Sequence, residues 1–331
     1  MDFHAEFFPR AFDKKINHRQ KLLLVGSCFT EQVGGKLSQH KFNTLENPNG
    51  ILFNPVSIAN AVLSYISGKR YSEEDLFFHH ELWGSWQHHT RFSHPEQEKV
   101  LEQINRSQER ASAFLKDADW LMLTLGSAFV YERHDIDAGI DYGNVVANCH
   151  KVPADKFSRR LLSSAEVSAV LSSMLTALKT HNPSLNIIFT ISPVRHLREG
   201  FIENNRSKAA LIQAVHGLTD NDSIFYFPSY ELVIDDLRDY RFYAEDMVHP
   251  NYAATNYVWQ KFTAVSMDET TLQLMKEINT INAARSHKAF NPASGAHKKF
   301  MQSNMEKAIG LQEQHPYLDL NDDIRYFREG I

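Results

Sequence analysis

The chain has 331 residues, with 35 Lys and Arg against 40 Asp and Glu, which gives a formal net charge of −5 at pH 7. A hydrophobic content of 43 % and a charged content of 23 % are typical of globular proteins and exclude disordered or collagen-like classes. Without a basic tract, the composition also argues against nucleic acid as a partner. The 17 His and 2 Cys stand out. Because histidine titrates nearest to neutral pH, they invite a search for acid–base or metal chemistry.

Targeting signals are weak in this sequence. The N-terminal segment lacks a basic region followed by an apolar stretch, which argues against a signal peptide. No apolar run approaches the ~20 residues that cross a bilayer, so we expect no membrane partner. Two Cys cannot form a disulfide framework. We therefore expect a cytoplasmic protein with reduced thiols.

Short apolar runs that end at turn residues predict four buried strands, which alternate with amphipathic helices. The predicted strands are 22–25, 120–125, 186–191 and 224–227. The predicted helices are 28–40, 55–67, 95–118, 164–180, 203–216 and 251–265. The alternation predicts an α/β protein, a flavodoxin-like three-layer sandwich with a central parallel sheet.

The segments between these elements are less regular. Residues 79–94 are predicted to form a loop or a short hairpin, and residues 128–160 a longer irregular stretch. After about residue 266 the sequence is polar and helical. We therefore expect an α/β domain over 1–265 and a helical C-terminal extension over 266–331. That extension would either cover the active site or form an oligomer contact.

Three turns follow predicted strands, and they carry the candidate chemistry. They are Gly26-Ser27-Cys28, Gly126-Ser127-Ala128 and Ser192-Pro193-Val194-Arg195-His196. In open α/β sheets, ligands bind outside the carboxyl ends of the strands. We expect all three turns to crowd one edge of the sheet.

The first of these turns resembles a known catalytic motif. Residues 24–31 read Leu-Val-Gly-Ser-Cys-Phe-Thr-Glu, which is similar to the first block of the SGNH (GDSL-type) hydrolases. Gly-Ser-Cys-Phe followed by a small residue also resembles the GSCFA family, a branch of that superfamily. Asp246-Met-Val-His249 is similar to the Asp-x-x-His block of SGNH enzymes. The resemblance covers most of residues 20–260, and further short segments of this chain resemble the GSCFA branch.

This resemblance implies Cys28 as nucleophile, with Ser27 as its rival, His249 as general base and Asp246 as the group that orients it. The chemistry suits these residue types, because a helix N-terminus and a neighbouring imidazole both lower the pKa of a thiol. We also expect main-chain N–H groups of Cys28 and Gly50 to act as oxyanion donors.

One position departs from the SGNH pattern. The third block of the superfamily is Gly-x-Asn-Asp, whose Asn donates to the oxyanion, whereas this chain has Gly126-Ser127-Ala128. Ala128 has no side-chain donor. Either Asn148, Asn54 or Arg195 replaces the missing amide, or the oxyanion hole has two donors.

Other polar residues have both a functional and a structural interpretation. Arg195 and His196 follow a strand and either bind an anionic substrate group or pair locally. His150, beside Cys149, either lies near the site or is structural. The basic stretch 195–208 is interrupted by acidic residues and is typical of a solvated helix surface.

Five histidines gather in one segment together with Trp83 and Trp86. Their spacing matches no zinc pattern, so we expect a solvated loop or a substrate-facing rim, and no metal or cofactor. These histidines are His79, His80, His88, His89 and His94.

The leading hypothesis is an SGNH-like acyl-transfer enzyme, an esterase or acyltransferase, that acts on a small-molecule or saccharide ester. The alternative is a non-catalytic SGNH-like module that binds a carbohydrate or a partner. A histidine metalloprotein is a third interpretation. The sequence leaves oligomerisation open.

Overall fold

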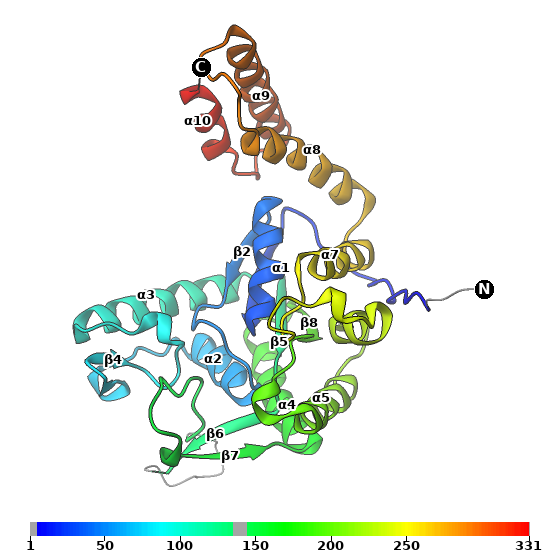
Figure 1. Cartoon of the computed structure of the whole chain (residues 1–331). Helices are drawn as coiled ribbons and strands as arrows, with labels where there is room; N and C mark the ends of the chain where they lie inside the picture. Colours follow the sequence, from blue (N-terminus) through cyan, green and yellow to red (C-terminus); the bar gives the residue numbers. More distant parts are fainter. Residues whose placement is uncertain (1–4, 135–143, 331) are drawn as a thin grey trace.

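A parallel five-stranded sheet forms the centre of the molecule (Figure 1). The computed structural model of the chain describes residues 5–134 and 144–330. The strands of the sheet are β1 (Lys21–Gly26), β2 (Asn43–Glu46), β5 (Trp120–Leu125), β8 (Asn186–Ile191) and β9 (Ile224–Phe227). They lie in the order β2-β1-β5-β8-β9, and every neighbouring pair is parallel. In chain order this is 2-1-3-4-5, the flavodoxin-like arrangement, so the predicted fold class is confirmed.

Helices cover both faces of the sheet. They are α1 (Cys28–Gln39), α2 (Pro55–Ser67), α3 (Gln97–Lys116), α4 (Ser164–His181), α5 (Phe201–His216) and α7 (Tyr252–Ser266). Successive strand residues point to opposite faces, so each strand feeds two cores. Leu23 and Val25 of β1 pack with α2, α3, α4 and α5, whereas Leu22 and Leu24 pack with α1 and α7. The result is the predicted three-layer sandwich.

The strand β2 was not predicted. Its four residues include one buried apolar side chain, Leu45, and the strand lies at the sheet edge, where it pairs with β1 alone. A run this short and polar carries no periodic signal. Its pairing in the sheet therefore depends on tertiary contacts.

Two small hairpins lie beside the sheet. The first pairs β3 (Phe77–His79) with β4 (Leu82–Gly84), which is one of the two forms expected for this region. The second pairs β6 (Phe129–Arg133) with β7 (Phe157–Leu161), so the prediction of an irregular stretch over 128–160 is wrong there. Both strands carry arginines, Arg133 and Arg160 on half-buried positions and Arg159 on an exposed one, and these charges mask the apolar character of the strands. Part of the intervening segment, 135–143, lies outside the described residues.

Short helical turns complete the described chain. They are η1 (Glu73–Asp75), η2 (Thr90–Phe92), η3 (Ala154–Lys156), η4 (Leu197–Glu199), α6 (Ser229–Glu231), the π-helical η5 (Leu232–Leu237) and η6 (Tyr240–Phe242).

The C-terminal part is helical, as predicted. It comprises α8 (Glu269–Ser286), α9 (Gly295–Gln314) and α10 (Asn321–Glu329), which pack around a hydrophobic core of their own. Figure 1 shows α9 and α10 standing away from the sheet. Within residues 5–134 and 144–330, no helix combines the length and apolar character that a membrane span needs.

The C-terminal helices dock near the amino-terminal ends of the strands. Asp323 of α10 is 1 % exposed and forms ion pairs with Lys41 Nζ (2.5 Å) and Arg285 (2.8 Å). Lys41 lies between the end of α1 and the start of β2, and Asn282 of α8 donates to the carbonyl oxygen of Gln39 (2.8 Å). Because α1 begins at the opposite edge, the extension does not cover the edge where the candidate site lies.

Candidate active site

The carboxyl ends of β1 and β5 form the topological switch point of the sheet. The chain leaves β1 into α1 on one face, and it continues after β5 towards α4 on the other. Ligands of such sheets bind outside this point. The N–H of Ser27 donates to the carbonyl oxygen of Thr124 (3.2 Å), and that of Ser192 donates to the carbonyl oxygen of Leu125 (2.8 Å). The prediction that the three turns share one edge is therefore confirmed.

The first turn requires glycine at position 26. Gly26 has φ +152°, and its N–H donates to Asn47 Oδ1 (2.8 Å). A Cβ at this position would lie 2.3 Å from the carbonyl oxygen of Thr124 on β5. Side chains are therefore excluded by backbone contact as well as by conformation. The glycine lets the chain turn sharply out of the sheet and begin α1 two residues later.

Cys28 is the first residue of α1 and is partly exposed. Burial raises the pKa of its thiol, and the backbone N–H groups of Phe29 and of Cys28 itself lower it, with a net rise above the ordinary value. The expectation of a depressed pKa is wrong for this structure, because desolvation outweighs the helix N-terminus. The thiol is therefore protonated at neutral pH and needs a base before it can attack.

Ser27 is less accessible than Cys28. It caps α1 with its extended backbone, but its side chain makes no capping hydrogen bond. The residue is fully buried, and its Oγ has no hydrogen-bond partner within the described part of the chain. Of the two candidate nucleophiles, Cys28 is the one with solvent access.

The predicted Asp–His pair is formed. His249 Nδ1 and Asp246 Oδ2 lie 2.7 Å apart, and the other oxygen of Asp246 accepts from the N–H groups of Val248 (2.9 Å) and His249 (3.0 Å). The backbone N–H of His249, its side chain and the N–H of Val248 hold the pKa of Asp246 at about 2. The carboxylate is therefore charged at neutral pH. The carboxylate can accept only from a protonated Nδ1, so Nε2 is the ring nitrogen that is left to accept a proton. Both side chains are about half exposed.

Arg195 anchors the loop that carries this pair. Its N–H donates to the carbonyl oxygen of Val248 (3.1 Å), and its guanidinium lies 4.2 Å from the ring centre of Tyr243 and 5.1 Å from that of Tyr240. A guanidinium that stacks on two rings is held by cation–π attraction. In this structure Arg195 therefore contacts the loop of Asp246 and His249 and its own neighbouring rings, and an anionic substrate group bound to it stays a prediction.

His196 lies between the turn at Gly126 and the Asp–His pair. Its Nε2 is 3.2 Å from the place where a Cβ on Gly126 would be, and this buried nitrogen has no hydrogen-bond partner in the described chain. Burial, followed by the charges of Lys208 and His249, lowers the pKa of His196 to about 3. The imidazole is thus neutral and can supply one N–H donor. No hydrogen bond joins Cys28 to His249 among the described residues.

Lys208 was missed in the sequence. It was assigned to a solvated surface, but it is 1 % exposed and donates to the carbonyl oxygens of Gly126 (2.6 Å) and Ser192 (2.7 Å). The available signal was its helical spacing, since Lys208 shares a face with the buried Leu211 and Val215. A lysine on the apolar stripe of a helix indicates a buried amine.

Two predicted oxyanion donors are engaged elsewhere. The N–H of Gly50 donates to the carbonyl oxygen of Asn47 (2.7 Å), so it is not free in this conformation. Asn54 caps α2: its Oδ1 accepts from the N–H of Ser57 (2.8 Å), and its amide donates to Ser57 Oγ (3.0 Å). The side chain of Asn54 is therefore engaged as a helix cap in this structure, and its role as an oxyanion donor stays a prediction.

The segment 148–150 forms a neighbouring loop. Asn148 Oδ1 accepts from the N–H of His150 (2.8 Å). His150 Nε2 lies 3.0 Å from the carbonyl oxygen of Ser85 and 3.1 Å from that of His88. It thereby tethers this loop to the histidine-rich segment, which is a structural role. The pKa of the Cys149 thiol is raised by burial.

The histidine-rich segment shows no metal site. Among residues 5–134 and 144–330, no three His, Cys, Asp or Glu are placed to hold a metal ion. His88 is buried, and burial lowers its pKa to about 3. A neutral buried imidazole hydrogen-bonded to Ser85 Oγ (3.0 Å) is part of the packing of this segment.

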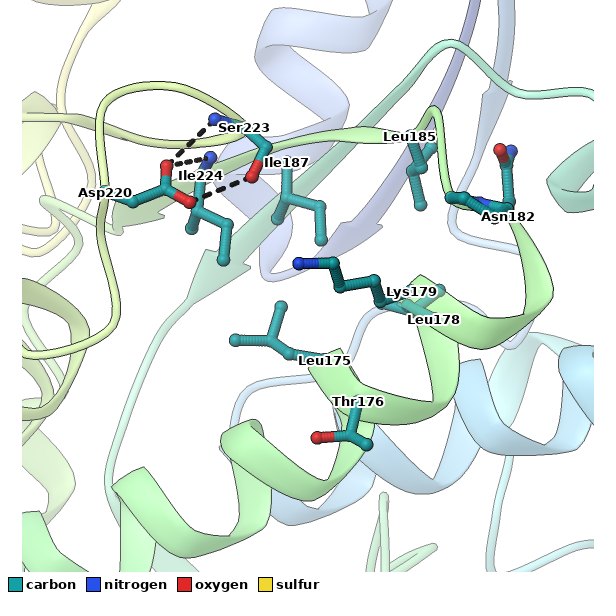
Figure 2. Close-up of a pocket in the computed structure, with 11 residues that line it drawn as sticks. Leu175, Thr176, Leu178, Lys179, Asn182, Leu185, Ile187, Asp220, Ser223 and Ile224 are labelled. Atoms are coloured by element: carbon teal, nitrogen blue, oxygen red, sulfur yellow. Dashed lines mark hydrogen bonds between the residues drawn. The ribbon is translucent and has the colours of Figure 1, made fainter.

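A separate hollow of about 180 Å³ lies at the opposite edge of the sheet (Figure 2). It is bordered by the end of α4 and by the turn before β9. Figure 2 shows the carboxylate of Asp220 turned towards its own loop, where it accepts from the backbone of Ser223 and Ile224. Burial raises the pKa of Asp220, but these bonds outweigh it and bring the value to about 2. The carboxylate holds a turn and supplies no reactive group.

Known structures with similar chain paths have low sequence identity. A carbohydrate esterase family 3 protein from Talaromyces cellulolyticus gives a TM-score of 0.37 at 11 % identity, over 78 % of this chain and 99 % of the other. An acetyl esterase variant with an acetate ion gives 0.35 at 11 % identity, with the same coverage. An acetyl xylan esterase from the rumen bacterium Butyrivibrio proteoclasticus gives 0.34 at 10 % identity, over 78 % of this chain and 64 % of the other.

Family membership follows from the sequence itself. No curated protein matches the chain. The model of the GSCFA family matches residues 21–262, which include both Cys28 and the Asp–His pair, and the model of the GSCFA C-terminal domain matches residues 278–331. The chain belongs to the GSCFA family.

Proposed function

We propose that this protein is an SGNH-like acyl-transfer enzyme, an esterase or acyltransferase, with Cys28 as its nucleophile. One observation carries the proposal. The partly exposed thiol of Cys28 lies at the first residue of α1, at the switch point of the sheet. At the same edge, His249 Nδ1 lies 2.7 Å from Asp246 Oδ2. This is the set of groups that nucleophilic acyl transfer needs.

The reaction begins when the Cys28 thiol passes its proton to Nε2 of His249, a step that requires a contact between the two groups that forms on substrate binding. The sulfur attacks the ester carbonyl carbon, and the carbonyl electrons move onto its oxygen. Collapse of this tetrahedral intermediate expels the alkoxide, which takes the proton from His249. Water or a second hydroxyl then attacks the thioester with His249 as base, and Cys28 is regenerated. Asp246 stabilises the imidazolium throughout.

The oxyanion needs donors, and two are suited to it. Cys28 is the first residue of α1, so its N–H has no acceptor within the helix. The neutral imidazole of His196 is oriented next to Gly126, close to the block whose Asn is replaced by Ala128. Each donor contributes roughly 2.7–4 kcal/mol to stabilisation of the transition state in enzymes of this type.

Hydrolysis of p-nitrophenyl acetate by four purified proteins tests the proposal. Cys28→Ala should lose at least about 10³-fold in kcat/KM, whereas Cys149→Ala, the matched control, should retain wild-type activity. Ser27→Ala should keep most of the activity. If Cys28→Ala is fully active and Ser27→Ala is inactive, the nucleophile is wrongly assigned. An acylated saccharide is the substrate class that the SGNH resemblance implies, so acetylated oligosaccharides form the second substrate set.

A non-catalytic binding module is the second candidate. It is favoured by the replacement of the third-block Asn with the buried Ala128, and by the N–H of Gly50, which is already bonded to Asn47. Alkylation by iodoacetamide separates the two. If the protein is an enzyme, iodoacetamide should alkylate Cys28 faster at neutral pH in the wild type than in His249→Ala. Equal rates in both proteins, with no hydrolysis of either substrate set, would favour the binding module.

A further inference from the structure

The buried amine of Lys208 has no role in the reaction as described above. α5 carries it beneath the site, where Nζ donates to the carbonyl oxygens of Gly126 (2.6 Å) and Ser192 (2.7 Å). These two carbonyls belong to the turns that follow β5 and β8. Because Gly26 pairs with Thr124 across β1 and β5, the turn at Gly126 adjoins the one that carries Cys28.

No carboxylate compensates this amine. Among the described residues, Lys208 forms no ion pair with Asp or Glu. A buried ammonium without an anion is strongly unfavourable, so its charge calls for a partner that can become negative. The titratable groups that face it are Cys28, His196 and Tyr230, whose ring centre is 5.7 Å from Nζ.

Cys28 is the neighbour suited to carry that negative charge. Burial and the neighbouring carboxylates raise the pKa of Tyr230, and His196 cannot become an anion. Glu31 also interacts with Cys28, but it lies on the exposed side of α1, where it forms an ion pair with Arg91 at 3.0 Å.

We propose that Lys208 is the buried counter-charge of the Cys28 thiolate, and this inference rests on the proposed nucleophilic role of Cys28. The interaction is reciprocal. Burial lowers the pKa of Lys208 to about 7 and Cys28 raises it, while Lys208 lowers the pKa of the Cys28 thiol against the effect of burial. Lys208 is a positioning residue that acts through the nucleophile.

The hydrogen bonds of Lys208 suit this role in both protonation states. A neutral amine has two N–H donors, which the two carbonyl oxygens satisfy. An ammonium has a third N–H that neither carbonyl occupies, and its positive charge acts on the nearby thiolate through space. When the Cys28 proton passes to His249 Nε2, one S–H bond breaks and one N–H bond forms. The negative sulfur is then balanced by Lys208 instead of being left unpaired.

The pH dependence of Cys28 alkylation tests this proposal. A Cys149→Ala background leaves Cys28 as the sole thiol, and iodoacetamide rates are measured from pH 5.5 to 10 alongside thiolate absorbance. Lys208→Gln keeps two N–H donors for the carbonyls but removes the charge. In this variant, Cys28 should be alkylated at least about 10-fold more slowly at pH 7 than in the parent, which is equivalent to a rise of about one unit in the thiol pKa. The alkylation rates of variant and parent should converge at high pH. Lys36→Gln, which removes a lysine about 12 Å further along α1, should match the parent.

An unchanged pH profile in folded Lys208→Gln would overturn the proposal, because a purely structural clamp would alter stability and not thiol ionisation. If Lys208→Gln does not fold, a measurement on the parent protein decides. A nearby cation should favour the reaction of Cys28 with anionic iodoacetate over its reaction with neutral iodoacetamide. The ratio of the two alkylation rates should therefore be higher for Cys28 than for free cysteine. A ratio equal to that of free cysteine would reject the counter-charge. Full ester hydrolysis by Cys28→Ala would instead refute the proposed function, and the alkylation profile would still report on the pair.

Discussion

Replacement of Gly26 with alanine tests the geometry on which the site depends. Gly26 has φ +152°, a conformation that costs an L-residue about 1–3 kcal/mol. The added Cβ would also lie 2.3 Å from the carbonyl oxygen and 2.8 Å from the nitrogen of Thr124. Both atoms are backbone of β5, so relief requires separation of two paired strands, and overpacking of this kind costs about 1–3 kcal/mol more. We expect Gly26→Ala to lose about 2–6 kcal/mol of unfolding free energy.

Urea denaturation followed by circular dichroism measures this change as a shift of the midpoint at constant slope. Gly35→Ala is the matched control. Gly35 lies within α1, has no atom within 4 Å of its would-be Cβ, and should gain up to about 1 kcal/mol from helix propensity. The two alanines should therefore act in opposite directions. If Gly26→Ala unfolds within about 0.5 kcal/mol of the wild type, the close approach of β1 and β5 at this turn is wrong.

Two further predictions concern buried and exposed carboxylates. Asp246→Asn should lower kcat by up to about 10⁴-fold with little change in KM, because the imidazolium of His249 loses its stabilising charge. The folded pKa of Asp246 is about 2, so its loop contacts are complete above about pH 4 and are lost as pH falls through 2. The Nδ1 proton resonance of His249 should weaken over that range, and full intensity well below pH 2 would contradict the assignment. Asp323→Ala should destabilise the C-terminal helices by about 1–3 kcal/mol, because the charged hydrogen bonds of Lys41 and Arg285 lose their acceptor. Trypsin should then cleave this region faster than in the wild type. A variant that resists trypsin as well as the wild type does would argue against the ion pairs.

Local signals in the sequence were sufficient for the main architecture. Buried strands such as 120–125 are continuous apolar runs, and α2 is delimited by Asn54 as cap, Pro55 at its first position and Gly68 in the left-handed conformation at its end. These signals involve contacts within a few residues, so they can be read without knowledge of the fold. The strand–turn–helix unit around Cys28 belongs to the same class, which is why its position at the sheet edge was predictable.

Interactions between distant segments decided the rest. The pairing of β2 at the sheet edge, and of β6 with β7, depends on partners far along the chain, and short polar strands have no periodic pattern of their own. The engagement of the Gly50 N–H and the docking of the C-terminal helices away from the site likewise come from the tertiary arrangement.

Which of the two thiols and 17 histidines could take part in chemistry depends on the tertiary arrangement. The sequence alone placed Cys28 at the start of a helix, and its resemblance to the SGNH enzymes implied the pairing of Asp246 with His249. The sign of the Cys28 pKa shift and the burial of Lys208 next to it depend on how much water the folded chain excludes. Desolvation is a property of the packed interior, contributed by several segments at once, so only the tertiary structure determines how this site ionises.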